Sequence, residues 1–296
     1  MATAAQWFEG ARPRTLPAAF APVIAGTAVA DFERGGTINL TRALLALIVA
    51  LALQVGVNYS NDYSDGIRGT DEQRVGPVRL VGQKLADPAA VKRAAIFSFA
   101  IAAFAGLALT LLTGAWWLLL VGAAAIAAAW LYTGGPSPYG YAGLGEVFVF
   151  LFFGVVATMG SAFVQTENLT GLAALTSVGI GALSCAILVT NNLRDIPGDT
   201  VSGKNTLAVR IGDQATRRFY CILLLAALIV VVLVAAMSTW WTLLALLVGA
   251  LMAAPVKIVL SGAEGRALIP VLAGTGRVLL AYSIALGVGL TIGALT

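Results

Sequence analysis

The chain alternates long apolar runs with short polar segments. A membrane crossing requires about 20 mostly apolar residues, so each run predicts at least one span. Two of the runs are long enough to fold as hairpins, with breaks at residues 113–115, 134–136 and 238–239. The pattern predicts an all-α polytopic membrane protein with nine transmembrane helices in a single domain, residues 1–296. The runs free of Asp, Glu, Lys and Arg are 15–30, 43–61, 94–145, 147–166, 168–193, 219–256 and 278–296.

The positive charges test this topology independently, because cytoplasmic loops carry an excess of Lys and Arg. If the N-terminus lies in the cytoplasm, every Lys and Arg except Arg34 and Arg42 falls in a cytoplasmic segment. The distribution therefore predicts a multi-pass protein of the cell membrane with its N-terminus inside. Basic residues next to the spans are interpreted as signals of topology that face lipid headgroups: Lys92, Arg93, Arg217 and Arg218.

Composition supports the membrane assignment and excludes several functions. The chain is 59% hydrophobic and 11% charged, whereas soluble proteins average about 25% charged residues. It has no histidine, which excludes zinc sites built on His and Ser-His-Asp triads. The net charge of +4 is spread over loops without a nucleic-acid-binding module, so no nucleic-acid partner is expected. No feature of the sequence indicates an obligate protein partner.

Two polar patches that are near copies interrupt the apolar pattern. The first, residues 61–65, reads NDYSD and is followed by Asp71; the second, residues 191–195, reads NNLRD and is followed by Asp199. Each patch ends a long apolar run, where a carboxylate is costly and calls for a partner. The repeat divides the chain into two halves, an arrangement typical of membrane folds whose site lies at the repeat interface. Both patches are predicted on the cytoplasmic face.

Asn and Asp oxygens at helical spacing predict a magnesium site. Residues four apart share a helix face, and oxygen ligands without imidazole or thiolate select Mg²⁺, which commonly also binds substrate phosphates. Pro197 disfavours a continuous helix beyond Asp195, so Asp199 is expected past the helix end and Asp195 is the stronger ligand candidate. The metal-ligand candidates are Asn61, Asp62, Asp65, Asp71, Asn191, Asp195 and Asp199.

Basic residues near the patches suit a diphosphate, since Arg forms forked hydrogen bonds with phosphate and Lys provides a point charge. The diphosphate candidates are Arg68, Arg74, Arg79, Arg194 and Lys204. Four further residues are less clearly marked. Arg12 and Arg14 could meet a carboxylate, but topology explains them equally well. Tyr132 and Tyr139 could stabilise a cation through the ring face or donate a hydrogen bond to a ligand, but they could also be interfacial anchors.

The two motifs resemble those of the UbiA superfamily of membrane prenyltransferases, with the forms N-D-x-x-D and D-x-x-x-D. Segments 12–27, 61–80, 131–146 and 191–212 are similar to the branch that prenylates 1,4-dihydroxy-2-naphthoate in menaquinone biosynthesis. The resemblance implies nine helices around a central cavity across which the two motifs face each other. It also implies Mg²⁺, a polyprenyl diphosphate and an aromatic carboxylic acid acceptor as ligands, with Asp65, Asp195 and Lys204 as catalytic residues. Diphosphate and CO₂ would be released.

Two alternatives remain open. A related enzyme could use another acceptor, such as 4-hydroxybenzoate. An ion-coupled secondary transporter could also place carboxylates at a repeat interface. Transporter sites lie near the midplane of the membrane, whereas both patches are predicted at the ends of helices.

Overall fold

The computed structural model describes residues 2–69 and 78–296, and this part of the chain contains helices and no strands. In chain order the elements are α1 (Ala4–Gly10), η1 (Pro13–Thr15), α2 (Pro17–Glu33), α3 (Leu40–Ile67), α4 (Pro88–Thr113), α5 (Trp117–Leu131), η2 (Tyr139–Ala142), α6 (Gly145–Val149), the π-helical η3 (Phe150–Val156), α7 (Ala157–Thr166), α8 (Gly171–Val201), α9 (Leu207–Met237), η4 (Trp240–Val248), α10 (Gly249–Leu260), η5 (Gly265–Leu268) and α11 (Ile269–Leu295).

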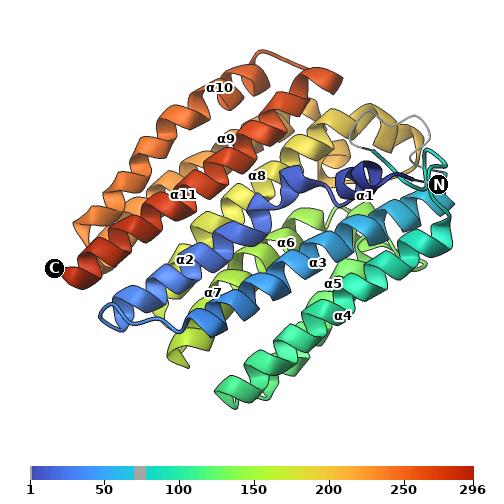
Figure 1. Cartoon of the computed structure of the whole chain (residues 1–296). Helices are drawn as coiled ribbons and strands as arrows, with labels where there is room; N and C mark the ends of the chain where they lie inside the picture. The colour runs from blue at the N-terminus through green and yellow to red at the C-terminus, as the bar shows by residue number, and fades with distance from the viewer. Residues whose placement is uncertain (1, 70–77) are drawn as a thin grey trace.

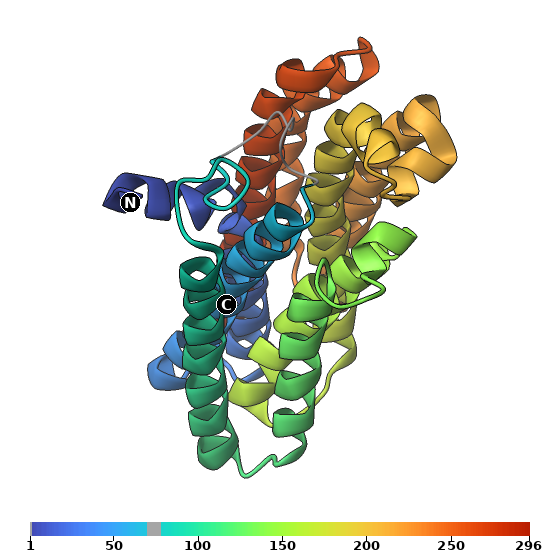
Figure 2. The same ribbon diagram turned by 90° about the vertical axis from the view of Figure 1, so that its right-hand side faces the viewer.

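The long helices lie side by side in a bundle and alternate in direction along the chain (Figure 1). α3 packs against α4, α8 against α9, and α2 against both α7 and α11. The short helix α1 lies across one end of the bundle (Figures 1 and 2). We call this the polar end; there α3, α5, α8 and α10 finish, and it includes the connections 78–87, 132–144, 202–206 and 261–264. Both sequence motifs therefore reach the same end of the bundle.

In the described part of the chain, seven helices are long and apolar enough to cross a membrane, and an eighth span results if the pair formed by residues 4–15 and 17–33, bent by 49°, counts as one. α5 is apolar but has only 15 residues, about 22 Å of helix at 1.5 Å per residue, against a hydrocarbon core of roughly 30 Å. The described residues thus support seven or eight spans by length. The predicted helix breaks are confirmed, because helices end at Thr113, Leu131 and Met237.

Local capping explains where α4 begins and where it ends, just before the turn that leads to α5. Asp87 accepts a hydrogen bond from the amide of Ala89 (3.0 Å), and Pro88 occupies the first helical position, where its missing N–H costs nothing. At the other end Gly114 adopts φ +69°, and its N–H donates to the carbonyl of Thr110 (2.8 Å). A residue without Cβ is favoured there because the left-handed conformation is strained for others.

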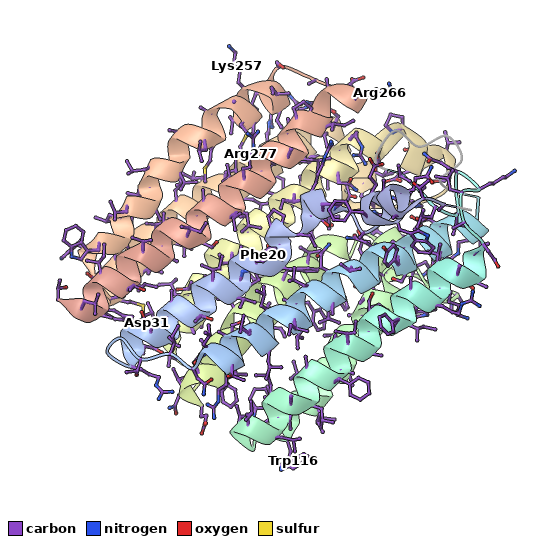
Figure 3. All side chains as sticks on the ribbon, viewed as in Figure 1. Phe20, Asp31, Trp116, Lys257, Arg266 and Arg277 are labelled. Carbon is purple, nitrogen blue, oxygen red and sulfur yellow. The ribbon has the colours of Figure 1, made fainter. Side chains whose placement is uncertain are left out.

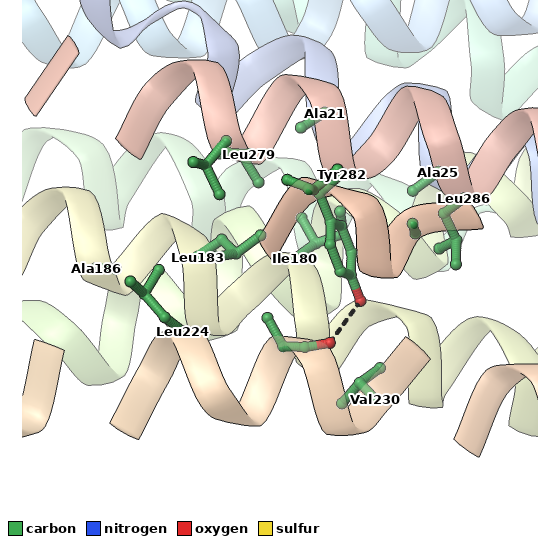
Figure 4. Close-up of a cluster of buried hydrophobic side chains, with 14 of the residues drawn as sticks. Ala21, Ala25, Ile180, Leu183, Ala186, Leu224, Val230, Leu279, Tyr282 and Leu286 are labelled. Carbon is green, nitrogen blue, oxygen red and sulfur yellow. Dashed lines mark hydrogen bonds between the residues drawn. The ribbon is translucent and has the colours of Figure 1, made fainter. Parts of the chain in front are cut away.

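The largest core cluster joins α2, α8, α9 and α11 (Figure 4). Tyr282 on α11 is fully buried, and its hydroxyl donates to the carbonyl of Ala227 on α9 (3.1 Å). Gly179 on α8 lies against that hydroxyl, and a side chain at this position would collide with it. Small residues let membrane helices approach closely. The half of the bundle that carries the second motif is therefore densely packed.

The two ends of the bundle differ in chemistry, as Figure 3 shows with Lys257 and Arg266 at the polar end and Asp31 and Trp116 at the other. Trp116 and Trp117 begin α5, and Trp240 and Trp241 begin η4, both at the opposite end. Trp is enriched at the membrane–water boundary. These side chains mark one boundary of the bilayer.

Arg217 does not face lipid headgroups as predicted. It is buried, and its guanidinium donates to both carboxylate oxygens of Asp213 (2.6 and 2.7 Å). It also donates to the carbonyl of Val259 (2.5 Å), in the last turn of α10, and to that of Ala263 (2.9 Å), just beyond the helix. Unpaired carbonyls at a helix C-terminus favour a cation. The interpretation was wrong because the sequence does not show which helix end packs beside this residue.

Candidate active site

A cavity of about 830 Å³ opens at the polar end and continues deep into the bundle. Its polar mouth is lined by Arg12, Arg14, Asn61, Asp65, Arg79, Tyr132, Tyr139, Tyr141, Asn191, Asn192, Arg194, Asp199 and Lys204. Its deep part is apolar and reaches Ala46, Leu109, Leu118 and Val164. Asp65 and Ala46 both line it from α3, so at 1.5 Å per residue the cavity extends about 28 Å along that helix. The space suits a long apolar chain with a polar head.

The two motifs meet at the mouth through an ion pair. Lys204 Nζ, which follows the second motif, lies 3.2 Å from Oδ2 of Asp65 in the first motif, and both side chains are buried. The backbone N–H of Lys204 donates to the carbonyl of Asp199 (2.8 Å), which fixes the lysine to the end of α8. The structure therefore brings both motifs to one cavity.

Tyr141 also holds Asp65, although the sequence did not single it out. Its hydroxyl donates to Asp65 Oδ1 (2.6 Å), and the ammonium of Lys204 lies 4.7 Å from the centre of its ring. Its carbonyl accepts from the amide of Asn205 (2.9 Å). Tyr141 thus links both motifs to the connection between α5 and α6. The only signal was its position in a tyrosine-rich loop near the predicted Tyr139.

The second motif lies entirely within α8, contrary to prediction. The helix continues through Pro197 to Val201, and Asp199 lines the cavity. Proline removes one backbone hydrogen bond, but α8 is packed along most of its length, and the next turn closes with a bond from Ser202 N–H to the carbonyl of Gly198 (2.9 Å). Tertiary packing outweighs the local penalty. The expectation that Asp199 lies past the helix end was therefore wrong.

Asp195 is engaged with its neighbour rather than exposed to the cavity. Arg194 donates to both of its carboxylate oxygens (2.7 and 2.8 Å) and to Oδ1 of Asn191 (2.7 Å). Asp195 is buried and is not among the residues lining the cavity, whereas Arg194 and Asn191 are. In the described structure the second motif presents Asn191, Asn192, Arg194 and Asp199 to the cavity.

Two further candidates from the first motif and its surroundings lie away from the cavity wall. Asp62 accepts hydrogen bonds from the amides of Leu80 (2.7 Å) and Val81 (3.1 Å). Arg68 is exposed and donates to the carbonyls of Thr133 and Gly135. Neither lines the cavity. Asp71 and Arg74 lie outside the described residues.

Amides on α3 extend the polar face of the first motif deeper into the bundle. Asn61 lines the cavity and accepts a hydrogen bond from Thr133 Oγ1 (2.8 Å). Gln54 and Asn58 donate to Thr15 Oγ1 (2.8 and 3.0 Å), and Asn58 also donates to the carbonyl of Ala11 (2.8 Å). They hold the segment that carries Arg12 and Arg14 at the cavity. Gln54 and Asn58 were not among the residues predicted from the sequence, although polar residues at helical spacing in an apolar run were the available signal.

Aromatic rings form one wall of the mouth. The rings of Tyr132 and Tyr139 meet edge to face at 5.5 Å, and Tyr139 stacks on Phe148 at 4.0 Å. The Tyr139 hydroxyl donates to the carbonyl of Ala128 (2.8 Å). Burial raises the pKa of Tyr139 above the ordinary value for tyrosine, so the ring stays neutral at physiological pH. Tyr139 also lines the cavity, and a neutral aromatic ring attracts a cation placed over its face.

The mouth of the cavity carries oxygen donors of the kind that a divalent cation requires. No group of three or more His, Cys, Asp or Glu able to hold a metal occurs in the part of the chain that the structure describes. Mg²⁺ does not require one, because it is commonly held by one or two carboxylates together with substrate phosphates and water. Asp65 and Asp199 both line the cavity with Asn61 and Asn191. The donor set fits Mg²⁺ bound jointly with a diphosphate.

Fold and site together define a polytopic membrane protein whose cavity suits a lipid with an anionic head. The UbiA prenyltransferase family is matched over residues 19–266, and the chain belongs to this family. It is 52% identical over 298 residues to a 1,4-dihydroxy-2-naphthoate octaprenyltransferase of Mycobacterium tuberculosis (strain ATCC 25618 / H37Rv), covering 100% of both chains. It is 41% identical to the enzyme of that name from Escherichia coli (strain K12) over 220 residues, 72% of this chain and 71% of the other.

Solved structures share the fold at low sequence identity. A UbiA homolog from Aeropyrum pernix K1 in its apo form superposes with a TM-score of 0.70 at 14% identity, covering 93% of this chain and 97% of that one. A UbiA homolog from Archaeoglobus fulgidus bound to GPP and Mg²⁺ gives a TM-score of 0.65 at 15% identity, covering 95% and 99%. The helical architecture is that of UbiA proteins.

Proposed function

We propose that this protein transfers a polyprenyl group from polyprenyl diphosphate to 1,4-dihydroxy-2-naphthoate, releasing diphosphate and CO₂ and forming demethylmenaquinol in menaquinone biosynthesis. The main observation is the Asp65–Lys204 pair at the mouth of a long apolar cavity. A carboxylate and a cation at the mouth suit Mg²⁺-diphosphate, and the apolar length suits the tail. Curated relatives named 1,4-dihydroxy-2-naphthoate octaprenyltransferase support the choice of acceptor.

The diphosphate head binds at the mouth. Arg79, Arg194 and Lys204 line the cavity there and supply the positive charge. Bound Mg²⁺, held by Asp65 and Asp199 with the amide oxygens of the motifs, supplies Lewis-acid stabilisation of the leaving diphosphate. Lys204 moves from Asp65 toward phosphate oxygens as the head binds. These cations stabilise the negative charge that grows on the leaving group.

The tail occupies the apolar part of the cavity. Leu118 and Val121 of α5 line one side of it, and Phe152 and Val156 of η3 line another. α5 packs on α3 and α4 rather than closely on η3. A tail longer than the cavity therefore leaves between α5 and η3 toward lipid.

The aromatic wall acts where positive charge develops. When the C1–O bond breaks, its electron pair leaves with the diphosphate and C1 becomes cationic. The rings of Tyr132 and Tyr139 face the cavity and stabilise that charge through their π-faces. The apolar lining excludes water that would otherwise trap the cation. The naphthoate ring attacks C1 instead.

The acceptor binds beside the N-terminal segment. Arg12 and Arg14 line the cavity and can pair with the carboxylate of the naphthoate. When CO₂ leaves, the electron pair of the broken C–C bond stays on the ring. The chain contains no histidine to serve as a base.

We also propose nine crossings with the N-terminus and the site on the cytoplasmic side. In residues 2–69 and 78–296, nine helical segments alternate in direction if α5 is included as a short span. Arg34 and Arg42 follow α2 and begin α3 at the end opposite the site, as the positive charge distribution requires. Labelling single cysteines placed at residues 37 and 262 from either side of sealed vesicles tests this orientation. Access to residue 37 from the cytoplasmic side would contradict it.

Product formation tests the function. Purified protein in lipid nanodiscs receives Mg²⁺, a polyprenyl diphosphate and either 1,4-dihydroxy-2-naphthoate or 4-hydroxybenzoate, and mass spectrometry identifies the product. Decarboxylated prenyl-naphthalenediol is expected. Prenylation of 4-hydroxybenzoate alone would move the protein to another branch of the family. Substrate uptake into proteoliposomes without any Mg²⁺-dependent product would support a transporter.

A further inference from the structure

Asp62, in the second position of the first motif, is occupied by backbone amides rather than aimed into the cavity. Its side chain is buried, and its two oxygens accept hydrogen bonds from consecutive N–H groups, those of Leu80 and Val81. A carboxylate accepts such bonds strongly because it is charged and acceptor-only. A metal ligand at Asp62 would have to compete with both of these bonds.

The residues that Asp62 holds form a compact turn, which we call the anchored turn (residues 78–86). Leu80 is fully buried, and Val81 lies against Gly66 of α3, where a side chain would collide with it. The turn is closed by hydrogen bonds from the amide of Leu85 to the carbonyl of Leu80 (2.8 Å) and from Gln83 to Arg79 (2.9 Å). The anchored turn is therefore fixed on α3 both by its hydrogen bonds to Asp62 and by the packing of Val81 against Gly66.

Arg79 immediately precedes the two amides that Asp62 accepts from. It is buried, with an exposed fraction of 5%, and it lines the cavity. Because the adjoining peptide groups are held by Asp62, the starting point of the Arg79 side chain is fixed relative to α3. The Asp62 carboxylate thus determines where the Arg79 side chain enters the cavity, although Asp62 itself does not enter it.

The second motif has a comparable anchor with the opposite hydrogen-bonding chemistry, although its residue, unlike Asp62, also lines the cavity. Asn192 occupies the position equivalent to Asp62, and its Nδ2 donates to Oε1 of Glu146 at the start of α6 (2.9 Å). Both Asn192 and Glu146 are buried. Backbone amides need an acceptor, which Asp provides, whereas a carboxylate needs a donor, which the Asn amide provides. In each half of the chain, the hydrogen-bonding capacity of the residue at the second motif position matches the groups that it holds.

We propose that the second position of each motif is an anchor matched to its partner, and that Asp62 is a positioning residue for Arg79 rather than a metal ligand. The part concerning Arg79 rests on the proposed function, since it assigns this arginine to the diphosphate. The anchoring by hydrogen bonds does not rest on the proposed function. This assignment replaces the prediction that Asp62 binds Mg²⁺.

The test of Asp62 compares D62N, R79Q, the D62N/R79Q double variant and D65N. Calorimetry measures the affinity for farnesyl diphosphate with Mg²⁺, and electron paramagnetic resonance counts Mn²⁺ bound with the same ligand. D62N and R79Q should each weaken binding about tenfold, the loss of a hydrogen bond to a charged group. The double variant should bind about as weakly as either single variant, since both changes remove the same contribution to binding. D62N should keep the full Mn²⁺ count, and D65N should lose bound Mn²⁺.

Loss of Mn²⁺ in D62N equal to that in D65N, or additive losses of about 100-fold in the double variant, would overturn the proposal. If the unaltered protein fails to bind farnesyl diphosphate with Mg²⁺, the proposed function fails instead. The anchor is then judged by hydrogen exchange, which should speed up at Leu80 and Val81 in D62N and not in D65N. Unchanged exchange in D62N overturns the anchor.

The second half supplies a test that does not depend on the folding of D62N. N192D places two buried carboxylates side by side and should lower the thermal midpoint at pH 8. The N192D/E146Q double variant should recover most of the loss, because the Gln amide donates to the new Asp. An N192D protein as stable as the unaltered one, or a double variant without recovery, would overturn the matched anchor.

Discussion

Lys204 Nζ and Asp65 Oδ2 lie 3.2 Å apart in a buried ion pair that joins the two halves of the chain. Removing one partner of such a pair is costly, because the other charge stays buried alone. The lysine also stands beside the carboxylate that we propose for Mg²⁺. This pair therefore connects the stability of the site with the binding of its ligands.

Replacing Asp65 with Asn should reduce turnover at least about 100-fold, since it removes a charged group that holds the stabilising cation. Product formation by mass spectrometry provides the measurement. Asp87→Asn is the matched control, because Asn caps a helix as well as Asp and Asp87 lies outside the cavity lining. Similar losses in both variants would contradict the role of Asp65.

Replacing Lys204 with Met should lower the thermal midpoint of the protein without metal and increase the stabilisation produced by Mg²⁺. The isolated Asp65 carboxylate then lacks its cation, and a ligand that binds more tightly stabilises the folded protein more. Thermal unfolding in detergent with EDTA and with Mg²⁺ gives both quantities. A Mg²⁺-induced shift smaller than in the unaltered protein would show that Asp65 does not bind the metal.

Tyr141→Phe removes the 2.6 Å hydrogen bond to Asp65 and keeps the ring. A hydrogen bond to a charged group contributes about 1.5–3 kcal/mol, so kcat/KM should fall about tenfold or more. Tyr139→Phe is the control, because its hydroxyl donates to the backbone carbonyl of Ala128 instead of a motif residue. A larger loss of kcat/KM in the Tyr139 variant would show that the Tyr139 hydroxyl matters more to the reaction than that of Tyr141.

Bulky residues at two glycines should shorten the preferred prenyl tail. Gly122 and Gly160 line the cavity, and a Cβ at either meets no atom within 4 Å. Gly122→Leu and Gly160→Leu therefore fill tail space with little collision, and the ratio of kcat/KM for long and short polyprenyl diphosphates should fall. Gly154→Ala, which would press on the backbone of Gly181, should reduce stability without changing that ratio. An unchanged ratio in both Leu variants would show that the tail follows another path.

Arg42→Ala should destabilise the end of the bundle opposite the site by about 2 kcal/mol, the scale of hydrogen bonds from a charged donor. Its guanidinium donates to the carbonyl of Leu112 on α4 (2.7 Å) and that of Val164 on α7 (2.9 Å). Glu167→Gln removes only the half-exposed partner of the same arginine and should cost less than about 1 kcal/mol. Thermal unfolding compares the two. Equal decreases of the thermal midpoint in the two variants would assign the stabilisation to the Arg42–Glu167 ion pair.

The membrane class, the helix breaks and the duplicated motifs were predictable from the sequence alone. These features are local: a run of apolar residues forms a span wherever it lies, and breaks at residues 113–115 and 238–239 follow from the residues there. The pairing of the halves was also predictable, since both patches end helices that run in the same direction. Lys204 beside Asp65 agrees with that prediction.

Which motif side chains reach the cavity depends on how the helices and loops pack around them. Asp62 and Asp65 share a helix and differ by less than one turn, yet one holds the anchored turn and the other meets Lys204 and Tyr141. Helical spacing says which residues share a face, but the partner on that face comes from segments far along the chain. Asp199 reached the wall for the same reason, because packing of α8 outweighed the local effect of Pro197.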